Sequence, residues 1–145
     1  MGTIKTFSGK LIHGGEDRIH IAGGSHDTAF RIVKLQLVGP TPGVDNGENV
    51  VKIYTDKQTT STGTIDFTDD TLLAAAYYQA EASSYSNWET IIFDETPFNQ
   101  DIFIGNFDAR GNATEMNYYL VLEEFKIKDA EAAVINYRGA LLHGE

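Results

Sequence analysis

The alternation of apolar and polar residues is clearest at residues 117–127, which read NYYLVLEEFKI. One face of this predicted strand carries Tyr118, Leu120 and Leu122, and the other carries Asn117, Tyr119, Val121, Glu123, Phe125 and Ile127. A strand that is half-buried in a sheet is apolar on one face only, whereas here both faces are largely apolar. We therefore expect this strand to lie centrally between two layers, or to have one face buried by another copy of the protein.

Other segments with strand-like patterns follow one another along the chain, separated by loops rich in Gly, Pro, Asp and Asn. They lie at residues 4–12, 18–22, 29–38, 49–55, 64–67, 88–94 and 100–107. In residues 29–38, Val33, Leu35 and Leu37 are expected on one face, with Lys34 and Gln36 on the other. Strands at this spacing are typical of an all-β sandwich or barrel.

Two segments fit either a helix or a strand. Residues 70–82 contain TLLAAAYYQAEA, whose alanines favour a helix that Asp70 would cap, while the neighbouring strands favour another strand. We predict a strand there. Residues 129–137 fit a last strand, with a short helix as the alternative. The resulting nine or ten strands predict one antiparallel β-sandwich over residues 1–145, of jelly-roll type.

Composition narrows the classes of protein to consider. The chain has 145 residues, 41% of them hydrophobic, which suffices for a core, and it has no cysteine for disulfides or thiolate metal sites. Its net charge of −10 and its scattered Lys and Arg argue against binding nucleic acid or an anionic membrane. No apolar run reaches the roughly 18 residues of a transmembrane helix, so we expect no membrane association.

Few residues suggest chemistry. Asp66, Asp69 and Asp70 lie close enough in sequence to offer oxygen ligands to calcium, although a solvated turn is the simpler interpretation. Ser25, His26 and Asp27 have the letters of a catalytic triad, but consecutive residues point in different directions. We expect no catalytic residues, no cofactor and no enzyme.

Aromatic residues suggest one binding function. Trp88 and Tyr85, with other tyrosines nearby, would give a platform on which sugar rings could stack. Packing in a core or an interface is the commoner role of such residues. A carbohydrate- or receptor-binding module is therefore one of the alternatives.

Several strand cores together resemble a known group of proteins. They are, in chain order, Phe30-Arg31-Ile32-Val33-Lys34, Lys52-Ile53-Tyr54-Thr55, Asp66-Phe67-Thr68-Asp69 with Leu72-Leu73-Ala74-Ala75, Phe98-Asn99-Gln100-Asp101-Ile102-Phe103-Ile104, and Asn117-Tyr118-Tyr119 with Leu122-Glu123. Over residues 30–137 the chain resembles small structural proteins of tailed phages of marine bacteria, of the cyanophage and pelagiphage type. The resemblance implies a virion component, such as a head decoration protein, and implies no catalytic residues.

The resemblance and the two apolar faces predict a non-enzymatic protein that decorates or cements the capsid exterior after synthesis in the host cytoplasm. Its expected partners are copies of itself, as a homo-oligomer, and a major capsid or other virion protein. The interface candidates are Tyr119, Val121, Phe125, Leu141 and Leu142. Residues 1–29 are a candidate assembly-contact segment, and residues 138–145 form a tail. A subunit of a tail or filament is the remaining alternative.

Overall fold

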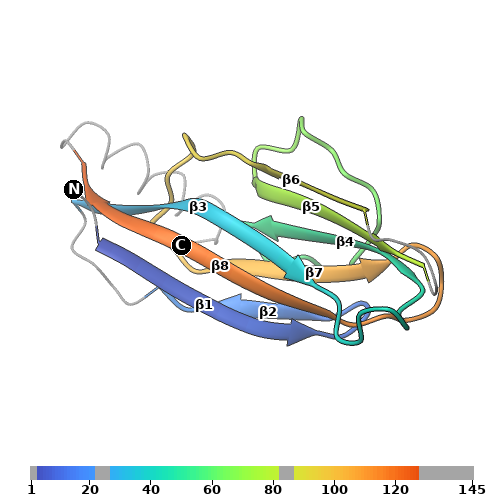
Figure 1. Cartoon of the computed structure of the whole chain (residues 1–145). Helices are drawn as coiled ribbons and strands as arrows, with labels where there is room; N and C mark the ends of the chain where they lie inside the picture. The colour runs from blue at the N-terminus through green and yellow to red at the C-terminus, as the bar shows by residue number, and fades with distance from the viewer. Residues whose placement is uncertain (1–2, 22–26, 82–86, 128–145) are drawn as a thin grey trace.

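The computed structural model describes residues 3–21, 27–81 and 87–127, which form eight strands in two antiparallel sheets packed face to face (Figure 1). The strands are β1 (Thr3–Leu11), β2 (Glu16–Ile19), β3 (Thr28–Val38), β4 (Gly47–Tyr54), β5 (Leu72–Ala80), β6 (Asn87–Ile92), β7 (Ile102–Asp108) and β8 (Met116–Lys126). The three-stranded sheet has the order β1-β8-β3, and the five-stranded sheet has the order β2-β7-β4-β5-β6. The predicted all-β antiparallel sandwich is confirmed.

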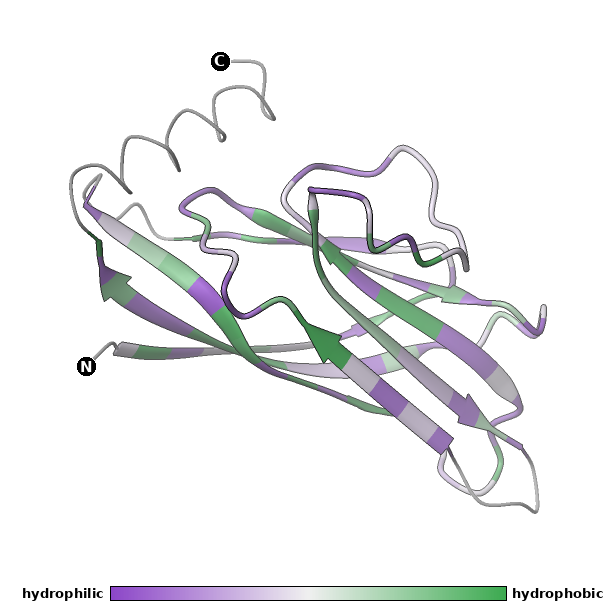
Figure 2. Cartoon of the chain, turned by 90° about the horizontal axis from the view of Figure 1, so that it is seen from above, coloured by the Kyte–Doolittle hydropathy of each residue, from purple (hydrophilic) through white to green (hydrophobic). Residues whose placement is uncertain are grey.

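The core lies between the sheets and is built from alternate residues of their strands. In β8, Tyr118, Leu120 and Leu122 are buried, while the residues between them are more exposed. Val51 and Ile53 of β4 are fully buried from the opposite side. This period-2 alternation appears as bands of hydropathy along the strands (Figure 2). One face of residues 117–127 packs the sandwich and β8 is the central strand of its sheet, while burial of the other face by another copy stays a prediction.

Strand β5 resolves the first ambiguous segment. Its alanines favour a helix locally, but β5 lies between β4 and β6 and pairs antiparallel with both. Ala74 and Ala76 face the core, and Ala75 on the opposite face is also buried. Small side chains are suited to a strand that is covered on both sides. The second ambiguous segment, residues 129–137, lies outside the described residues.

The strand predicted at residues 64–67 is wrong. This segment is loop and turn, and it lies within the long connection between β4 and β5. The carboxylate of Asp66 accepts hydrogen bonds from the backbone N–H and the hydroxyl of Thr68, at 2.9 and 2.6 Å. An aspartate that bonds the backbone two residues ahead forms a turn, which competes with a strand.

The predicted side of Val33 is also wrong. The pairing of β3 with β8 shifts between Ile32 and Lys34, so Val33 is an extra residue in a β-bulge. Val33 is 41% exposed, whereas Ile32 and Leu35 on either side of the bulge are buried. Ile32 and Leu35 therefore both face the core although two residues separate them, and local alternation alone does not reveal this.

The pairing of the strands agrees in part with a jelly roll. A jelly roll can be described as a wrapped hairpin, in which strands one and eight, two and seven, three and six, and four and five are partners. The structure contains the pairs β1·β8, β2·β7 and β4·β5, but β6 pairs with β5 and not with β3. One isolated bridge, from Phe30 to Phe98, lies on this side of β3. The jelly-roll type therefore stays a prediction.

Candidate binding surfaces

The outer face of β8, formed by Tyr119, Val121 and Phe125, points away from the sandwich core. Tyr119 is 42% exposed and lies in register between Ser8 of β1 and Gln36 of β3. Val121 and Phe125 are partly buried. Three of the predicted interface residues thus lie along one side of one central strand, where a second protein can reach Tyr119. The other two, Leu141 and Leu142, are outside the described residues.

The Phe125 end of this face is held by charged neighbours. The Arg31 guanidinium lies 5.2 Å from the centroid of the Phe125 ring, and its Nε donates to the Glu123 carboxylate at 2.7 Å. Ala29 and Ile127 form a small buried cluster against which Phe125 packs. The accessible apolar part of the outer face of β8 therefore centres on Tyr119.

A groove lies where the three-stranded sheet ends at β3 and the five-stranded sheet continues to β6. This β3–β6 groove has a volume of about 390 Å³ and is lined by Leu35, Gln36, Leu37, Val38, Tyr77, Tyr78, Trp88 and Thr90. None of these lining residues is charged, although the chain carries a net charge of −10. Its most exposed aromatic residue is Trp88, at 66%. The groove is therefore apolar, with neutral polar groups among its lining.

The predicted sugar platform is only partly described. Trp88 lies in register with Tyr78 on β5, and both line the β3–β6 groove. Tyr85 lies outside the described residues. The hydroxyl of Tyr77 donates to the Gln79 side chain at 3.0 Å. An accessible indole beside a tyrosine suits a sugar or an apolar side chain equally, so carbohydrate binding stays a prediction.

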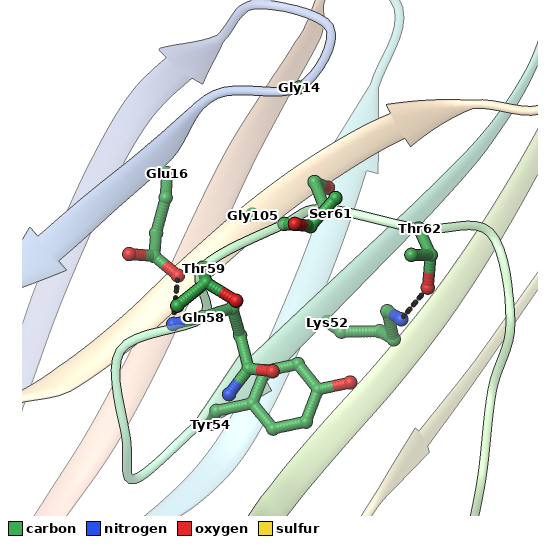
Figure 3. Close-up of a pocket in the computed structure, with 10 residues that line it drawn as sticks. Gly14, Glu16, Lys52, Tyr54, Gln58, Thr59, Ser61, Thr62 and Gly105 are labelled. Atoms are coloured by element: carbon green, nitrogen blue, oxygen red, sulfur yellow. Dashed lines mark hydrogen bonds between the residues drawn. The ribbon is translucent and has the colours of Figure 1, made fainter.

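A smaller, polar cavity lies on the outer side of the five-stranded sheet, between that sheet and the β4–β5 connection (Figure 3). It measures about 90 Å³. Its lining includes Glu16, Lys52 and Tyr54 from the sheet and Gln58 and Thr62 from the connection. The Glu16 carboxylate accepts the backbone N–H of Gln58 at 3.1 Å. A space of this size suits a few water molecules.

Lys52 fastens the β4–β5 connection to the sheet. Its Nζ donates to the backbone oxygen of Thr64 at 2.5 Å and to the Thr62 hydroxyl at 3.3 Å. Burial lowers the pKa of Lys52, and the Asp69 carboxylate partly opposes that shift. Since Lys52 is only 7% exposed, its ammonium stabilises the loop and is a poor group for capturing a ligand. This contact was not predicted from the sequence, although a single lysine between apolar residues of β4 could have indicated it.

Two of the three weak calcium candidates, Asp66 and Asp69, accept hydrogen bonds within turns. Hydrogen bonds from the side chain and backbone of Thr68 lower the pKa of Asp66. Asp69 accepts from the backbone N–H and the hydroxyl of Thr71, at 2.9 and 2.7 Å. Asp69 and Asp70 line a shallow hollow with Phe67 and Phe93. Within the described ranges, no group of three or more His, Cys, Asp or Glu side chains is placed to hold a metal ion.

Comparison of the chain with known protein families, with curated proteins and with solved structures finds no match. The part of the chain that the structure describes also contains no helix long and apolar enough to cross a membrane. The outer face of β8 and the β3–β6 groove are thus the two surfaces from which function can be argued. The sequence pattern predicted the first surface but not the groove, because residues of three strands, β3, β5 and β6, line it.

Proposed function

We propose that this chain is a non-enzymatic structural protein of a tailed-phage virion. It decorates or cements the capsid exterior by associating with copies of itself and with a shell protein. The outer face of β8 supports this role, because it presents Tyr119 at the centre of a sheet with Val121 and Phe125 on the same side. Tyrosines are enriched at protein interfaces, where they combine apolar area with a polar tip.

The sandwich suits such a role mechanically. A decoration protein stabilises a shell through many copies, each of which adds a modest contact area, so that affinity accumulates by avidity. A flat sheet face held by a rigid core can repeat the same contact on every copy without a large change in conformation. The resemblance of the strand cores to virion proteins of marine tailed phages agrees with this use.

A substitution on the outer face of β8 tests self-association. Tyr119→Glu places a charge at the centre of the face, and we expect it to weaken association by at least about tenfold, measured by sedimentation velocity. The matched control is Ile91→Glu on β6, because Ile91 is 40% exposed and faces outward from the other sheet. The control should associate like the parent protein, and both variants should keep the parent's melting temperature.

Two further results decide the proposal. Mass spectrometry of purified phage particles should detect the chain, and electron cryo-microscopy should place its density outside the shell. A protein that is strictly monomeric in solution and absent from purified virions would contradict the proposed function. Loss of association in Ile91→Glu but not in Tyr119→Glu would place the contact on the five-stranded sheet and would contradict the role of the outer face of β8.

A further inference from the structure

The two sheets have three and five strands, so within the described residues no strand of the smaller sheet lies opposite β6. Trp88 and Thr90 of β6 lie in register with Tyr78 and Ala76 of β5, whose side chains face the core. Trp88 and Thr90 therefore stand on the core-facing side of their sheet. Trp88 is nevertheless 66% exposed, because the opposite sheet ends at β3. Figure 1 shows β6 at the margin of the sandwich, beyond β5.

Beyond the bridge to Phe98, the margin of β3 beside this face pairs with no strand among the described residues. Further back along β3, Phe30 exchanges two backbone hydrogen bonds with Phe98, at 2.7 and 2.9 Å, on the side away from β8. Residues of β3 with core-facing side chains, such as Phe30, thus direct their backbone groups away from β8. After the bulge, this description applies to Leu35 and Leu37.

No other described strand pairs with β3 on this side. The N–H and C=O groups of Leu35 and Leu37 consequently point along the β3–β6 groove with no strand partner in the described part of the chain. Backbone polar groups are satisfied by water at an open edge or by another strand. The bulge at Val33 disrupts the edge near Ile32, but it leaves the stretch from Leu35 to Val38 regular.

The size and charge of the groove limit what can occupy it. Four residues of β3 line it, which corresponds to a strand of roughly 13 Å. A strand pairing of that length buries much less surface than the roughly 800 Å² per partner that a stable dimer buries. A second copy that paired through its own β3 would also meet β5 and β6, which project past this edge. The occupant is therefore a single extended segment, and the uncharged lining selects uncharged side chains.

We infer that the β3–β6 groove is an acceptor site for an extended, uncharged polypeptide segment, which pairs with β3 at Leu35 and Leu37. Alternate apolar side chains of that segment cover Trp88 and Thr90, so the segment becomes the fourth strand of the three-stranded sheet. This mode is strand addition, in which backbone hydrogen bonds give affinity and pockets for alternate side chains give specificity. It goes beyond the proposed function, because it requires neither a capsid nor the outer face of β8.

Amide hydrogen exchange with a synthetic probe tests the inference. The probe is the blocked peptide acetyl-Gly-Ser-Thr-Val-Thr-Val-Thr-Val-Ser-Gly-amide, added to the full chain and followed by NMR. We expect exchange at Leu35 and Leu37 to slow by at least about tenfold at saturation. Gln36 is an internal control, because its backbone faces β8 and is already paired. A second probe, N-methylated on the alternate residues that would face β3, should not bind.

Side-chain variants distinguish binding in the β3–β6 groove from non-specific binding of the probe elsewhere on the protein. Trp88→Ser should weaken binding of the probe by about tenfold, whereas Ile91→Ser, on the opposite side of β6, should leave it unchanged. Three results would overturn the inference. They are exchange at Leu35 and Leu37 that stays unchanged at millimolar probe, equal binding of the N-methylated probe, and Trp88-dependent binding of a cello-oligosaccharide in place of the peptide.

Discussion

Single buried polar residues tie together parts of the chain that are distant in sequence. Asn106 of β7 occupies a core position, where its amide donates to the backbone oxygens of Leu11 and Thr114, both at 3.2 Å. Asn49 of β4 donates to the side chain of Asn106 at 2.8 Å and to the oxygen of Thr114 at 2.9 Å. These bonds fix the relative register of β4, β7 and the start of β8, because a slip would leave buried groups unsatisfied.

Asp108 gives a prediction at this scale. Its carboxylate accepts the backbone N–H groups of Glu48, Arg110 and Thr114, at 2.9 to 3.1 Å. Burial raises the pKa of Asp108, but these amide donors outweigh burial and hold the pKa below its usual value. Because the folded-state pKa is depressed, the stabilisation is complete above the unfolded-state pKa of about 3.9 and is lost as pH falls through the folded-state value.

The test is the variant Asp108→Asn. Near neutral pH it should lower the free energy of unfolding by about 2 kcal/mol, measured by urea denaturation. As pH falls from about 3.9 through the lower folded-state pKa, the difference between the variant and the parent should shrink, since the parent's carboxylate then becomes neutral too. The half-buried Asp45, which accepts one backbone N–H from Thr41, serves as a control through Asp45→Asn. A difference for Asp108→Asn that is independent of pH would contradict the assignment.

At the scale of elements, strand β3 shows how one extra residue changes a sheet. Without Val33, the core-facing Phe30, Ile32, Leu35 and Leu37 would alternate regularly with polar residues. The bulge therefore inserts a residue without moving the apolar side chains off the core. It also interrupts the edge of β3 near Ile32, so that the regular stretch available to another strand begins at Leu35.

Two single-valine deletions test the bulge. Deleting Val33 should preserve the fold and shift the melting temperature by less than about 8 °C, because the remaining residues already fit a regular strand. Deleting Val121 from the partner strand should abolish cooperative unfolding, because it turns Leu122 outward and Glu123 into the core. Circular dichroism with thermal melting measures both. A Val33 deletion that unfolds the protein would show that the bulge is required for folding.

At the scale of the whole molecule, charge opposes assembly. The net charge of −10 makes copies of the chain repel one another, while the outer face of β8 offers only a small apolar area for contact. The proposed self-association would therefore depend on how strongly the solution screens this repulsion.

Self-association should accordingly strengthen as salt is added. Screening shortens the Debye length from about 30 Å at 0.01 M to about 8 Å at 0.15 M, so the oligomeric fraction in sedimentation velocity should rise over this range. Sucrose at equal osmolality is the control, since it adds no ions. Dissociation of the oligomer by salt would indicate instead that ion pairs between subunits dominate the contact.

Local alternation by itself determined that the protein is all-β and where most of its strands lie, whereas the structure decided which faces of β4 and β8 are buried. These features follow from the period-2 geometry of a strand, which acts over a few residues. Alternation failed at the bulge of Val33 and at the turn of Asp66, because a register shift and a side-chain hydrogen bond leave no period-2 signal.

Only the tertiary structure decided the rest. The alanines of β5 form a strand because β4 and β6 pair with it on both sides, and those pairings outweigh a local preference for helix. The pairing of β6 with β5, and not with β3, exposes Trp88 and leaves β3 beyond the Phe98 bridge with no strand partner in the described residues. The β3–β6 groove exists only through this long-range choice of partners, so a local pattern of residues cannot encode it.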